Sequence, residues 1–219
     1  MEWKLQILSR TTKKALDAAR GMDWLEKDGW YLAGGTALAL QAGHRQSIDL
    51  DFFAQKKIFP PAEVTSHFPN DTAIWDPYIV KEGTVYAKLH GAKVSFIAYP
   101  FFTPALPRHH YGLVPILDTN DIAVMKVIAL SQRGRKRDFV DLYWYAKNVA
   151  PLASVIRKLP HQYAGITHNY QHIIRAFTYF ADAENDPMPT LLFDATWEEI
   201  KRYFEREATK LAKELLGLE

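Results

Sequence analysis

No cysteine occurs among the 219 residues of the sequence. This absence excludes disulfide bonds, a thiolate nucleophile and cysteine-ligated zinc. The sequence has no run of about 18 apolar residues, which argues against a helix that spans a membrane. Its first residues, MEWKLQILSRTTKK, contain no apolar core before a small-residue cleavage site, so we expect no secretion signal. These absences predict a cytoplasmic protein without a membrane partner.

Excess charge of one sign is also lacking, because 27 Lys and Arg residues face 25 Asp and Glu residues, for a net charge of +2. Any surface that binds nucleic acid must therefore be local. The Walker motif G-x-x-x-x-G-K-[ST] and the dinucleotide motif G-x-G-x-x-G are absent as well, which excludes those two modes of phosphate binding. The remaining composition, 48% hydrophobic and 24% charged, is that of an ordinary globular protein.

The first chemical signal lies in the stretch WYLAGGTALALQAGHRQSIDLDFF, residues 30–53. Gly34 and Gly35 end a short apolar run that we expect to be a strand, and a short helix is expected to follow them. Backbone amides at the start of such a helix, together with its positive end, are suited to an anion. We therefore predict that Gly34, Gly35 and Thr36 bind the phosphates of a nucleoside triphosphate.

An acidic pattern follows in Ile48-Asp49-Leu50-Asp51-Phe52. At a strand's period of two, Asp49 and Asp51 point to one face and the three apolar side chains to the other. Mg²⁺ and Mn²⁺ prefer oxygen ligands, and two such ions roughly 4 Å apart can stabilise both oxygens of an in-line phosphoryl displacement. We predict a strand over 48–53 whose two carboxylates bind Mg²⁺ (or Mn²⁺).

Glycine pair and acidic strand together resemble the signature of the nucleotidyltransferase superfamily. Ala33-Gly34-Gly35 is followed, after thirteen residues, by Asp49-Leu50-Asp51-Phe52. Within that superfamily, the segment GGTALALQAGHRQSIDLDFF resembles the corresponding segment of the AbiEii/AbiGii-type toxins. The resemblance implies an α/β fold with a nucleotidyltransferase-like mixed sheet core, an NTP substrate and a separately encoded antitoxin. It also implies that Arg45, in the GHR segment, contacts phosphate.

The expected later strands, 72–80, 84–89 and 93–99, add to the βαβ start in a mixed sheet. In the superfamily a third carboxylate usually comes from such a strand, but Ser95 stands at the corresponding place in Val94-Ser95-Phe96. Three explanations stay open. Another acid (Asp76, Asp118 or Asp121) replaces it, metal alone activates the attacking hydroxyl, or the protein binds nucleotide without turning it over.

The second half of the chain has a helical pattern from Asp118 onward. In AbiEii-like proteins a lysine within such a helix is followed by R-x-x-x-RDF-x-D, and this sequence contains Lys126, Arg133, Arg137-Asp138-Phe139 and Asp141. The resemblance implies a triphosphate contact for Lys126 and site-supporting roles for Asp138 and Asp141. Arg137 and Asp141 are also spaced to pair along one helix. We predict two domains, a core at 1–117 and a helical domain at 118–219 that completes the site.

A long loop is expected over Pro100–Gly112, and its adjacent histidines, His109 and His110, lack a partner cluster for metal binding. Another local feature is a basic cluster whose members are Arg133, Arg135, Lys136 and Arg137. Such a cluster forms either a solvated corner or a surface for a polyanionic acceptor such as tRNA.

The sequence therefore predicts a Mg²⁺-dependent nucleotidyltransferase, acting as the toxin of a bacterial toxin–antitoxin pair. It would move a nucleoside monophosphate from an NTP to an acceptor, with tRNA or another RNA as the expected acceptor. Catalysis would rest on Asp49, Asp51 and Lys126, supported by Asp138 and Asp141. Two alternatives stay open. One is an inactive nucleotide- or partner-binding protein of the same fold, and the other is a kinase-like phosphotransferase that moves the γ-phosphoryl group.

Overall fold

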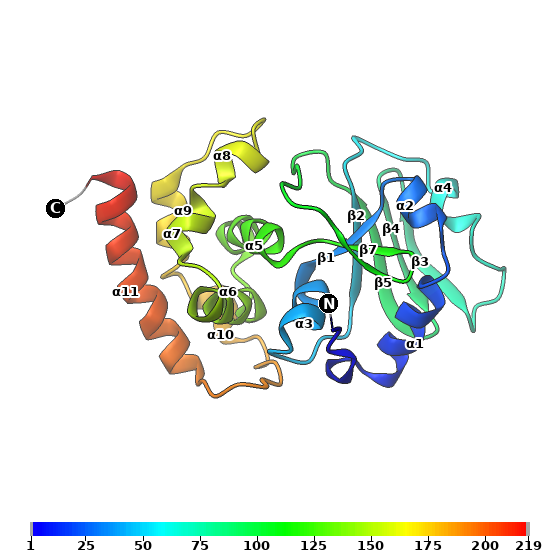
Figure 1. Cartoon of the computed structure of the whole chain (residues 1–219), viewed down its shortest axis with the longest axis horizontal. Helices are drawn as coiled ribbons and strands as arrows, with labels where there is room; N and C mark the ends of the chain where they lie inside the picture. Colours follow the sequence, from blue (N-terminus) through cyan, green and yellow to red (C-terminus); the bar gives the residue numbers. More distant parts are fainter. Residues whose placement is uncertain (1, 218–219) are drawn as a thin grey trace.

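The computed structural model describes residues 2–217 and places a sheet at one end of the molecule and a group of helices at the other (Figure 1). The strands are β1 (Tyr31–Ala33), β2 (Leu50–Ala54), β3 (Trp75–Lys81), β4 (Thr84–Leu89), β5 (Ala92–Ala98), β6 (His109–Tyr111) and β7 (Val114–Ile116). The helices are η1 (Leu5–Ile7), α1 (Arg10–Ala19), α2 (Trp24–Lys27), α3 (Gly34–Ala42), α4 (Ala62–Thr65), α5 (Thr119–Arg133), α6 (Lys136–Asn148), α7 (Leu152–Ile156), α8 (Leu159–Gln162), α9 (Tyr170–Ala176), α10 (Ala181–Glu184) and α11 (Trp197–Leu216).

The described strands form one seven-stranded sheet in the order β3-β4-β5-β2-β1-β7-β6. Strand β2 runs parallel to β5, and β1 runs parallel to β7, while the remaining neighbours are antiparallel. The sheet is therefore mixed, which confirms the predicted fold class. Its central register matters most for the site, because Asp51 pairs with Ala33 on one side and with Ser95 on the other.

The fold starts with the predicted order of strand, helix and strand, but β1 and β2 are antiparallel and do not form a parallel crossover unit. Ala33, the last residue of β1, pairs with Asp51 near the beginning of β2. The chain thus leaves and re-enters the sheet at the same end. Helix α3 extends beyond that end, and no crossover returns the chain to the opposite end.

Strand β2 begins two residues later than predicted. Ile48 lies before the strand and is 59% exposed, whereas Leu50 and Phe52 are buried in the core. The hydroxyl of Thr12 donates a hydrogen bond to the carbonyl of Ile48, which holds this segment against α1. Ile48 therefore does not point into the core with Leu50 and Phe52, because the alternation of side chains in β2 begins only after this residue.

The loop expected over Pro100–Gly112 contains a short strand instead. Residues 109–111 form β6, and a turn at Gly112, which has a φ of +62°, leads into β7. Strand β7 then pairs in parallel with β1 in the middle of the sheet. Each of these strands has three residues, which is too short for a period-two pattern to stand out in the sequence.

The helical end packs against the sheet end through α5, which contacts α3 as well as α6, α7 and α9. One hydrophobic cluster contains side chains from both sides of residue 117, so the division into domains at 1–117 and 118–219 stays a prediction. The last helix, α11, begins after Thr196, which forms a reciprocal capping box with Glu199. None of the described helices is long and apolar enough to cross a bilayer.

Candidate active site

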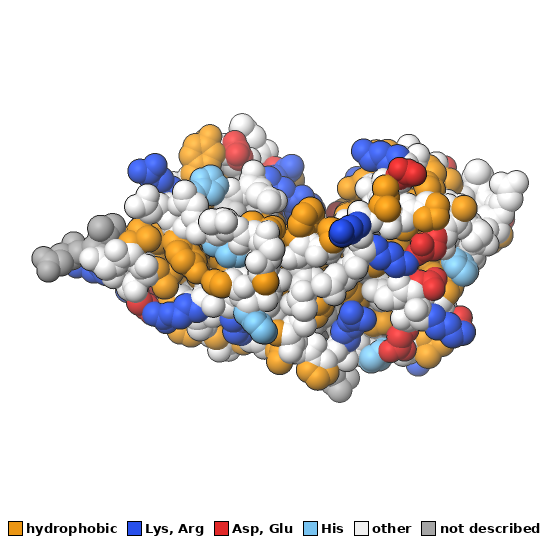
Figure 2. Space-filling model, turned by 90° about the horizontal axis from the view of Figure 1, so that it is seen from above, with side chains coloured by type: hydrophobic (Ala, Val, Ile, Leu, Met, Phe, Trp, Pro, Cys, Tyr) orange, Lys and Arg blue, Asp and Glu red, His pale blue; other side chains and the backbone are white. Residues whose placement is uncertain are grey.

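A cavity of about 430 Å³ lies between one face of the sheet and helix α5. Figure 2 shows the molecule hollowed between its sheet end and its helical end, with Lys and Arg side chains beside the hollow. The cavity brings together residues that are far apart in the sequence. Its polar lining includes Gly34, Gly35, Thr36, Arg45, Ser47, Asp49, Asp51, Lys93, Ser95, Lys126, Gln132, Arg133 and Arg137.

The glycine turn connects the end of β1 directly to the first residue of α3. Gly34 has a φ of +72°, a conformation that L side chains rarely adopt. A Cβ atom there would also lie 3.2 Å from Oδ2 of Asp51. The turn thus needs glycine for its backbone conformation and for the close approach of a carboxylate. As predicted, the first amides of α3 lie beside the acidic strand.

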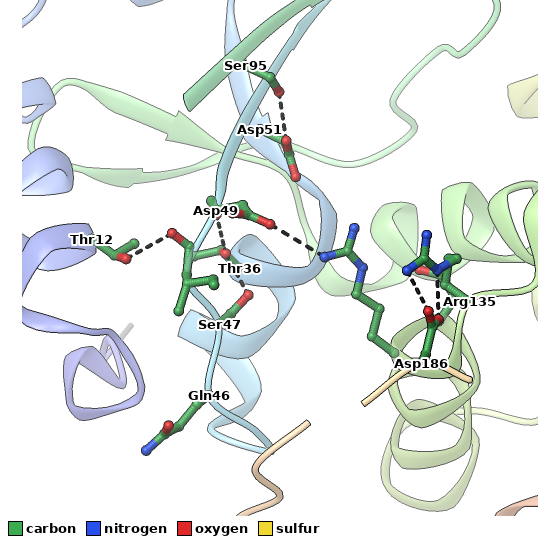
Figure 3. Close-up of polar contacts among 12 residues, drawn as sticks. Thr12, Thr36, Gln46, Ser47, Asp49, Asp51, Ser95, Arg135 and Asp186 are labelled. Carbon is green, nitrogen blue, oxygen red and sulfur yellow. Dashed lines mark hydrogen bonds and ion pairs between the residues drawn. The ribbon is translucent and has the colours of Figure 1, made fainter. Parts of the chain in front are cut away.

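Asp49 and Asp51 lie on the same side of their segment and face the helices (Figure 3). Oδ1 of Asp51 accepts a hydrogen bond of 2.7 Å from the hydroxyl of Ser95. Oδ2 of Asp49 lies 3.4 Å from Nη1 of Arg137, while its Oδ1 is buried and has no hydrogen-bond partner. Burial raises the pKa of Asp51, and the hydrogen bond from Ser95 opposes this rise. The two acids therefore form a partly buried, incompletely paired carboxylate cluster.

Ser95 occupies the position beside Asp51 where a third carboxylate is expected, and none of the three alternative acids replaces it. Asp76 pairs with Lys88, Asp118 caps α5, and Asp121 accepts hydrogen bonds from the amides of residues 105 and 106. None of them lines the cavity. Within residues 2–217 no group of three or more His, Asp or Glu side chains stands together as a metal site.

A buried ionic network lies behind the cavity wall. Nζ of Lys126 lies 2.6 Å from Oδ1 of Asp138 and 2.6 Å from Oδ2 of Asp141. Arg45 donates two hydrogen bonds to Asp141, of 2.6 and 3.0 Å, and Nε2 of His44 donates a third at 2.8 Å. Burial alone would raise the pKa of Asp141, but Arg45 and Lys126 hold it well below its ordinary value. Asp141 is thus an ionised anchor for three basic side chains.

The chain matches a known protein family over most of its length. The family model described as "Nucleotidyl transferase AbiEii toxin, Type IV TA system" matches residues 22–73 and 94–215. The chain belongs to the AbiEii nucleotidyltransferase toxin family. An uncharacterized protein of Aquifex aeolicus (strain VF5) is 31% identical over 184 residues, which cover 81% of this chain and 85% of that protein.

One solved structure shows the same fold. A candidate nucleotidyltransferase from H. pylori is 20% identical and superposes with a TM-score of 0.52, over 96% of this chain and 99% of that one. MenT4, a nucleotidyltransferase toxin from Mycobacterium tuberculosis H37Rv, is 16% identical with a TM-score of 0.48, over 92% of this chain and 86% of that one.

In this AbiEii family member the two predicted phosphate contacts outside the glycine turn are already engaged. Arg45 lines the cavity, but its guanidinium is held by Asp141 and is almost fully buried. Lys126 uses two of the three N–H donors of its ammonium for Asp138 and Asp141. The third N–H donor of Lys126 remains available for a hydrogen bond to a ligand in the cavity.

The predicted pairing of Arg137 with Asp141 along helix α6 is wrong. Arg137 is half-exposed and reaches across the cavity to Asp49, whereas Asp141 turns inward to Arg45 and Lys126. Helical spacing places two side chains near one another, but a buried carboxylate binds the cations that are buried with it. The structure thus adds a long ion pair between helix α6 and the acidic strand.

The basic cluster is divided between two places. Arg133 and Arg137 line the cavity, whereas Arg135 and Lys136 do not line it and contact residues 184–186, so the predicted acceptor contact of these two residues stays a prediction. Nε of Arg135 donates to Asp186 at 2.7 Å (Figure 3). Nζ of Lys136 donates to the carbonyls of Glu184 and Asp186, at 3.1 and 2.7 Å. These two residues fasten α6 to the segment before α11.

Thr36 lines the cavity, but its hydroxyl is already bonded. It lies 2.7 Å from the hydroxyl of Ser47 and donates to the backbone carbonyl of Asp49 (Figure 3). The side chain of Thr36 therefore ties the first turn of α3 to the start of β2. Because the hydroxyl is engaged, only the backbone amide of Thr36 is available for the predicted phosphate contact.

Several cavity residues are missing from the sequence-based prediction. Tyr78 and Tyr86 come from the outer strands β3 and β4, with their ring centroids 6.3 Å apart. Lys93 and Ile97 flank Ser95 at the strand's period of two, so their position on the cavity face could have been inferred from Ser95. The tyrosines carried no such signal, because the register that brings them to Ser95 depends on the pairing of distant strands.

We expect the substitution Gly35→Ala to destabilise the protein by about 1–3 kcal/mol, through overpacking. A Cβ atom at this position would lie 2.2 Å from Nη2 of Arg45 and 3.6 Å from Oδ2 of Asp141. Although the first neighbour is the end of a long side chain, its two hydrogen bonds to Asp141 prevent it from moving away. Urea denaturation would measure the change. Gly165→Ala is the matched control, since nothing lies within 4 Å of its Cβ, and an equal stability of both variants would contradict this packing argument.

Proposed function

We propose that this AbiEii family member transfers a nucleoside monophosphate from an NTP to an RNA acceptor such as tRNA and releases pyrophosphate. The observation that carries the proposal is the shared cavity, which gathers the glycine turn, Asp49, Asp51 and Lys126 around one space. Its volume of about 430 Å³ falls within the range of small-ligand sites, about 300–1,000 Å³. Catalysis at this site would come mainly from positioning and electrostatics.

Mg²⁺ or Mn²⁺ fits the two aspartates. Oδ1 of Asp49 is buried without a hydrogen-bond partner, and a carboxylate oxygen in that state is a ready ligand for a hard cation. The second carboxylate, Asp51, is buried beside it and has one neutral donor, Ser95. Such a cation, when bound, would supply positive charge to the reacting phosphate oxygens. The proposal therefore assigns Asp49 and Asp51 as its ligands.

The other residues of the site would hold the triphosphate and its surroundings in place. The amides of Gly34, Gly35 and Thr36 lie at the positive end of α3, where anions are favoured. Lys126 would donate its third N–H to a phosphate oxygen, while Asp138 and Asp141 keep its ammonium fixed and charged. Arg45 would act through Asp141 as a positioning residue. Arg133 and Arg137 are exposed cations of the cavity, as is Lys93, and would face the remaining phosphate charge.

One observation favours a second function for the same fold. Ser95 stands where the superfamily has a third carboxylate, and its hydroxyl donates to Asp51 rather than taking a proton from an acceptor. A protein that binds an NTP or a partner without chemistry would tolerate this change. If the protein is a transferase, the bound cation would activate the acceptor hydroxyl in place of a third carboxylate. If it only binds a nucleotide or a partner, no such activation is needed.

Product analysis separates the candidate functions. The protein would be incubated with Mg²⁺, total tRNA and each NTP, labelled in turn at the α- and the γ-phosphate. We expect α-label in the RNA and pyrophosphate as the second product, and loss of both with Asp49→Ala. Transfer of γ-label with release of a nucleoside diphosphate would instead establish a phosphotransferase. Tight NTP binding with no label transfer for any of the NTPs would overturn the transferase in favour of the binding protein.

Family membership extends the proposal to the biological role. The family description names a toxin of a type IV toxin–antitoxin system. We propose that the chain acts as such a toxin in the cytoplasm, where NTPs and tRNA are present, and that a separately encoded antitoxin counteracts it. In this proposal residues 1–117 supply the acids and the glycine turn, and residues 118–219 supply Lys126 and the buried carboxylates that hold it.

A further inference from the structure

A second cavity, of about 420 Å³, adjoins the first, and the glycine turn and the two aspartates assigned to the NTP site do not line it. Gln132 and Arg133 line both cavities, so the last turn of α5 forms the wall between them. The remaining lining of the second cavity is contributed by residues at the end of α5, by α9 and by the segment that leads into α10. The two cavities therefore lie side by side, with Gln132 and Arg133 exposed to both.

The charge of the second cavity suits a phosphodiester. Arg133 is 58% exposed at the shared wall, and Arg175 is exposed without an ion pair to any residue from 2 to 217. Nε2 of His172 donates to the carbonyl of Ser131, which holds the imidazole against α5. One acid, Asp182, also lines the cavity. Two guanidinium groups thus face a single carboxylate, which leaves net positive charge.

The second cavity also presents an aromatic side chain. Tyr179 is 56% exposed, and its ring packs against no other aromatic ring among the described residues. Arg133 lies 3.7 Å from Asp138, whereas Arg175 has no ion pair to any residue from 2 to 217. An exposed aromatic side chain beside such an arginine is a combination with which proteins bind single-stranded nucleic acid, since every base offers a face for stacking. A small anion would not require such a ring.

We infer that the second cavity binds the nucleotide next to the reacting 3′ end of a single-stranded polynucleotide acceptor. This inference rests on the proposed function, because it takes the first cavity as the place where the acceptor end meets the NTP. Tyr179 stacks on the base, Arg175 contacts the phosphodiester, and Arg133 contacts the phosphate at the passage between the cavities. Stacking and phosphate contact do not read a base, so the cavity selects a free single-stranded end rather than a sequence.

Direct binding tests this inference without any chemistry. A fluorescein-labelled single-stranded oligonucleotide of mixed sequence, as RNA and as DNA, is titrated with the protein by fluorescence anisotropy, without NTP or metal. We expect Tyr179→Ala to weaken binding about tenfold, as base stacking requires, and Tyr179→Trp to restore it. Arg175→Ala should weaken binding and reduce the slope of log Kd against log salt by about 0.7, because one phosphate contact is lost.

Arg157→Ala is the matched control, since this arginine is also exposed but pairs with Glu214 and lines neither cavity. We expect its affinity to equal that of the unmodified protein. Unchanged affinity in both Tyr179→Ala and Arg175→Ala would overturn the inference, and so would a protein that binds neither oligonucleotide at low salt. Because NTP is absent, loss of binding in these variants supports the second cavity even if label transfer fails. If the unmodified protein transfers the α-label to RNA but the Tyr179 and Arg175 variants bind the oligonucleotides normally, the role of the second cavity is rejected and the proposed transferase function is not.

Discussion

The substitution Asp51→Asn should lower the rate of label transfer by at least about a thousandfold. A bound cation contributes several kcal/mol to the stabilisation of a phosphoryl transition state, and each 1.36 kcal/mol corresponds to about a tenfold change in rate. Asparagine keeps the shape of the side chain and can still accept the hydrogen bond from Ser95, but it loses the negative charge that binds the cation. The transfer assay with α-labelled NTP would measure this loss.

Folding stability should not fall with activity in this variant. Burial raises the pKa of Asp51, which means that the folded protein pays a free-energy cost for its ionised form at neutral pH. Asparagine avoids that cost, so we expect a melting temperature equal to or above that of the unmodified protein. This combination, lost activity with retained or increased stability, is typical of a residue kept for function.

Asp76→Asn provides the control for a general effect of charge removal. Asp76 is an exposed acid on β3 that pairs with Lys88 and does not line the cavity, so its replacement should leave transfer unchanged. If Asp51→Asn retained more than about a tenth of the activity, the carboxylate would not be a ligand of an essential cation. A strongly lowered melting temperature would instead assign Asp51 to the stability of the fold.

The substitution Asp141→Asn should have the largest effect on stability, about 3–5 kcal/mol at neutral pH. Asp141 is fully buried and accepts hydrogen bonds from Arg45 and His44 while it pairs with Lys126. Its replacement by a neutral amide leaves the buried guanidinium of Arg45 without a countercharge, which is the costly case for a buried ion pair. Urea denaturation would measure the free energy of unfolding.

The effect of Asp141 should also depend on pH with a defined sign. Because its pKa is lowered in the folded state, its ionised form contributes full stability above the unfolded value of about 3.9. That contribution is lost as the pH falls through the lower, folded-state pKa. The stability difference between the unmodified protein and Asp141→Asn should stay constant from pH 7 to about pH 5 and then shrink in stronger acid.

Glu214→Gln is the matched control, because Glu214 forms an ion pair with an arginine that is exposed rather than buried. Surface pairs of this kind contribute about 0–1 kcal/mol, so this variant should unfold almost like the unmodified protein. Equal stabilities of Asp141→Asn and Glu214→Gln would contradict the role of Asp141 as the charge centre of the network. A difference that did not shrink in acid would contradict the assigned ionisation state.

Short-range sequence patterns predicted several features of the fold and the site correctly. The glycine turn and the acidic pair follow from backbone conformation and strand alternation, and both depend on residues within a few positions of one another. The strands expected over 84–89 and 93–99, and with them the mixed sheet, follow from the same kind of local signal. The family, now shown by comparison, was also apparent from these local motifs.

Other features depended on which side chains become buried together. The family resemblance assigns Arg45, Lys126 and Asp141 to one site, but nothing in the sequence indicates that Asp141 forms ion pairs with both cations, because this pairing requires α3, α5 and α6 to pack side by side. The same packing turns Arg135 and Lys136 away from the cavity and leaves Arg133 and Arg137 on its wall. Linear spacing cannot distinguish the members of such a cluster.

Local chemistry in the chain was thus sufficient for the turn, the acidic strand and the fold class, since steric limits and side-chain alternation act over a few residues. Long-range packing set the rest: which acid stays ionised, which cations remain available, and how a second cavity comes to adjoin the first. The physical reason is that burial and charge pairing depend on distances in space, and these arise when segments far apart in the sequence come into contact.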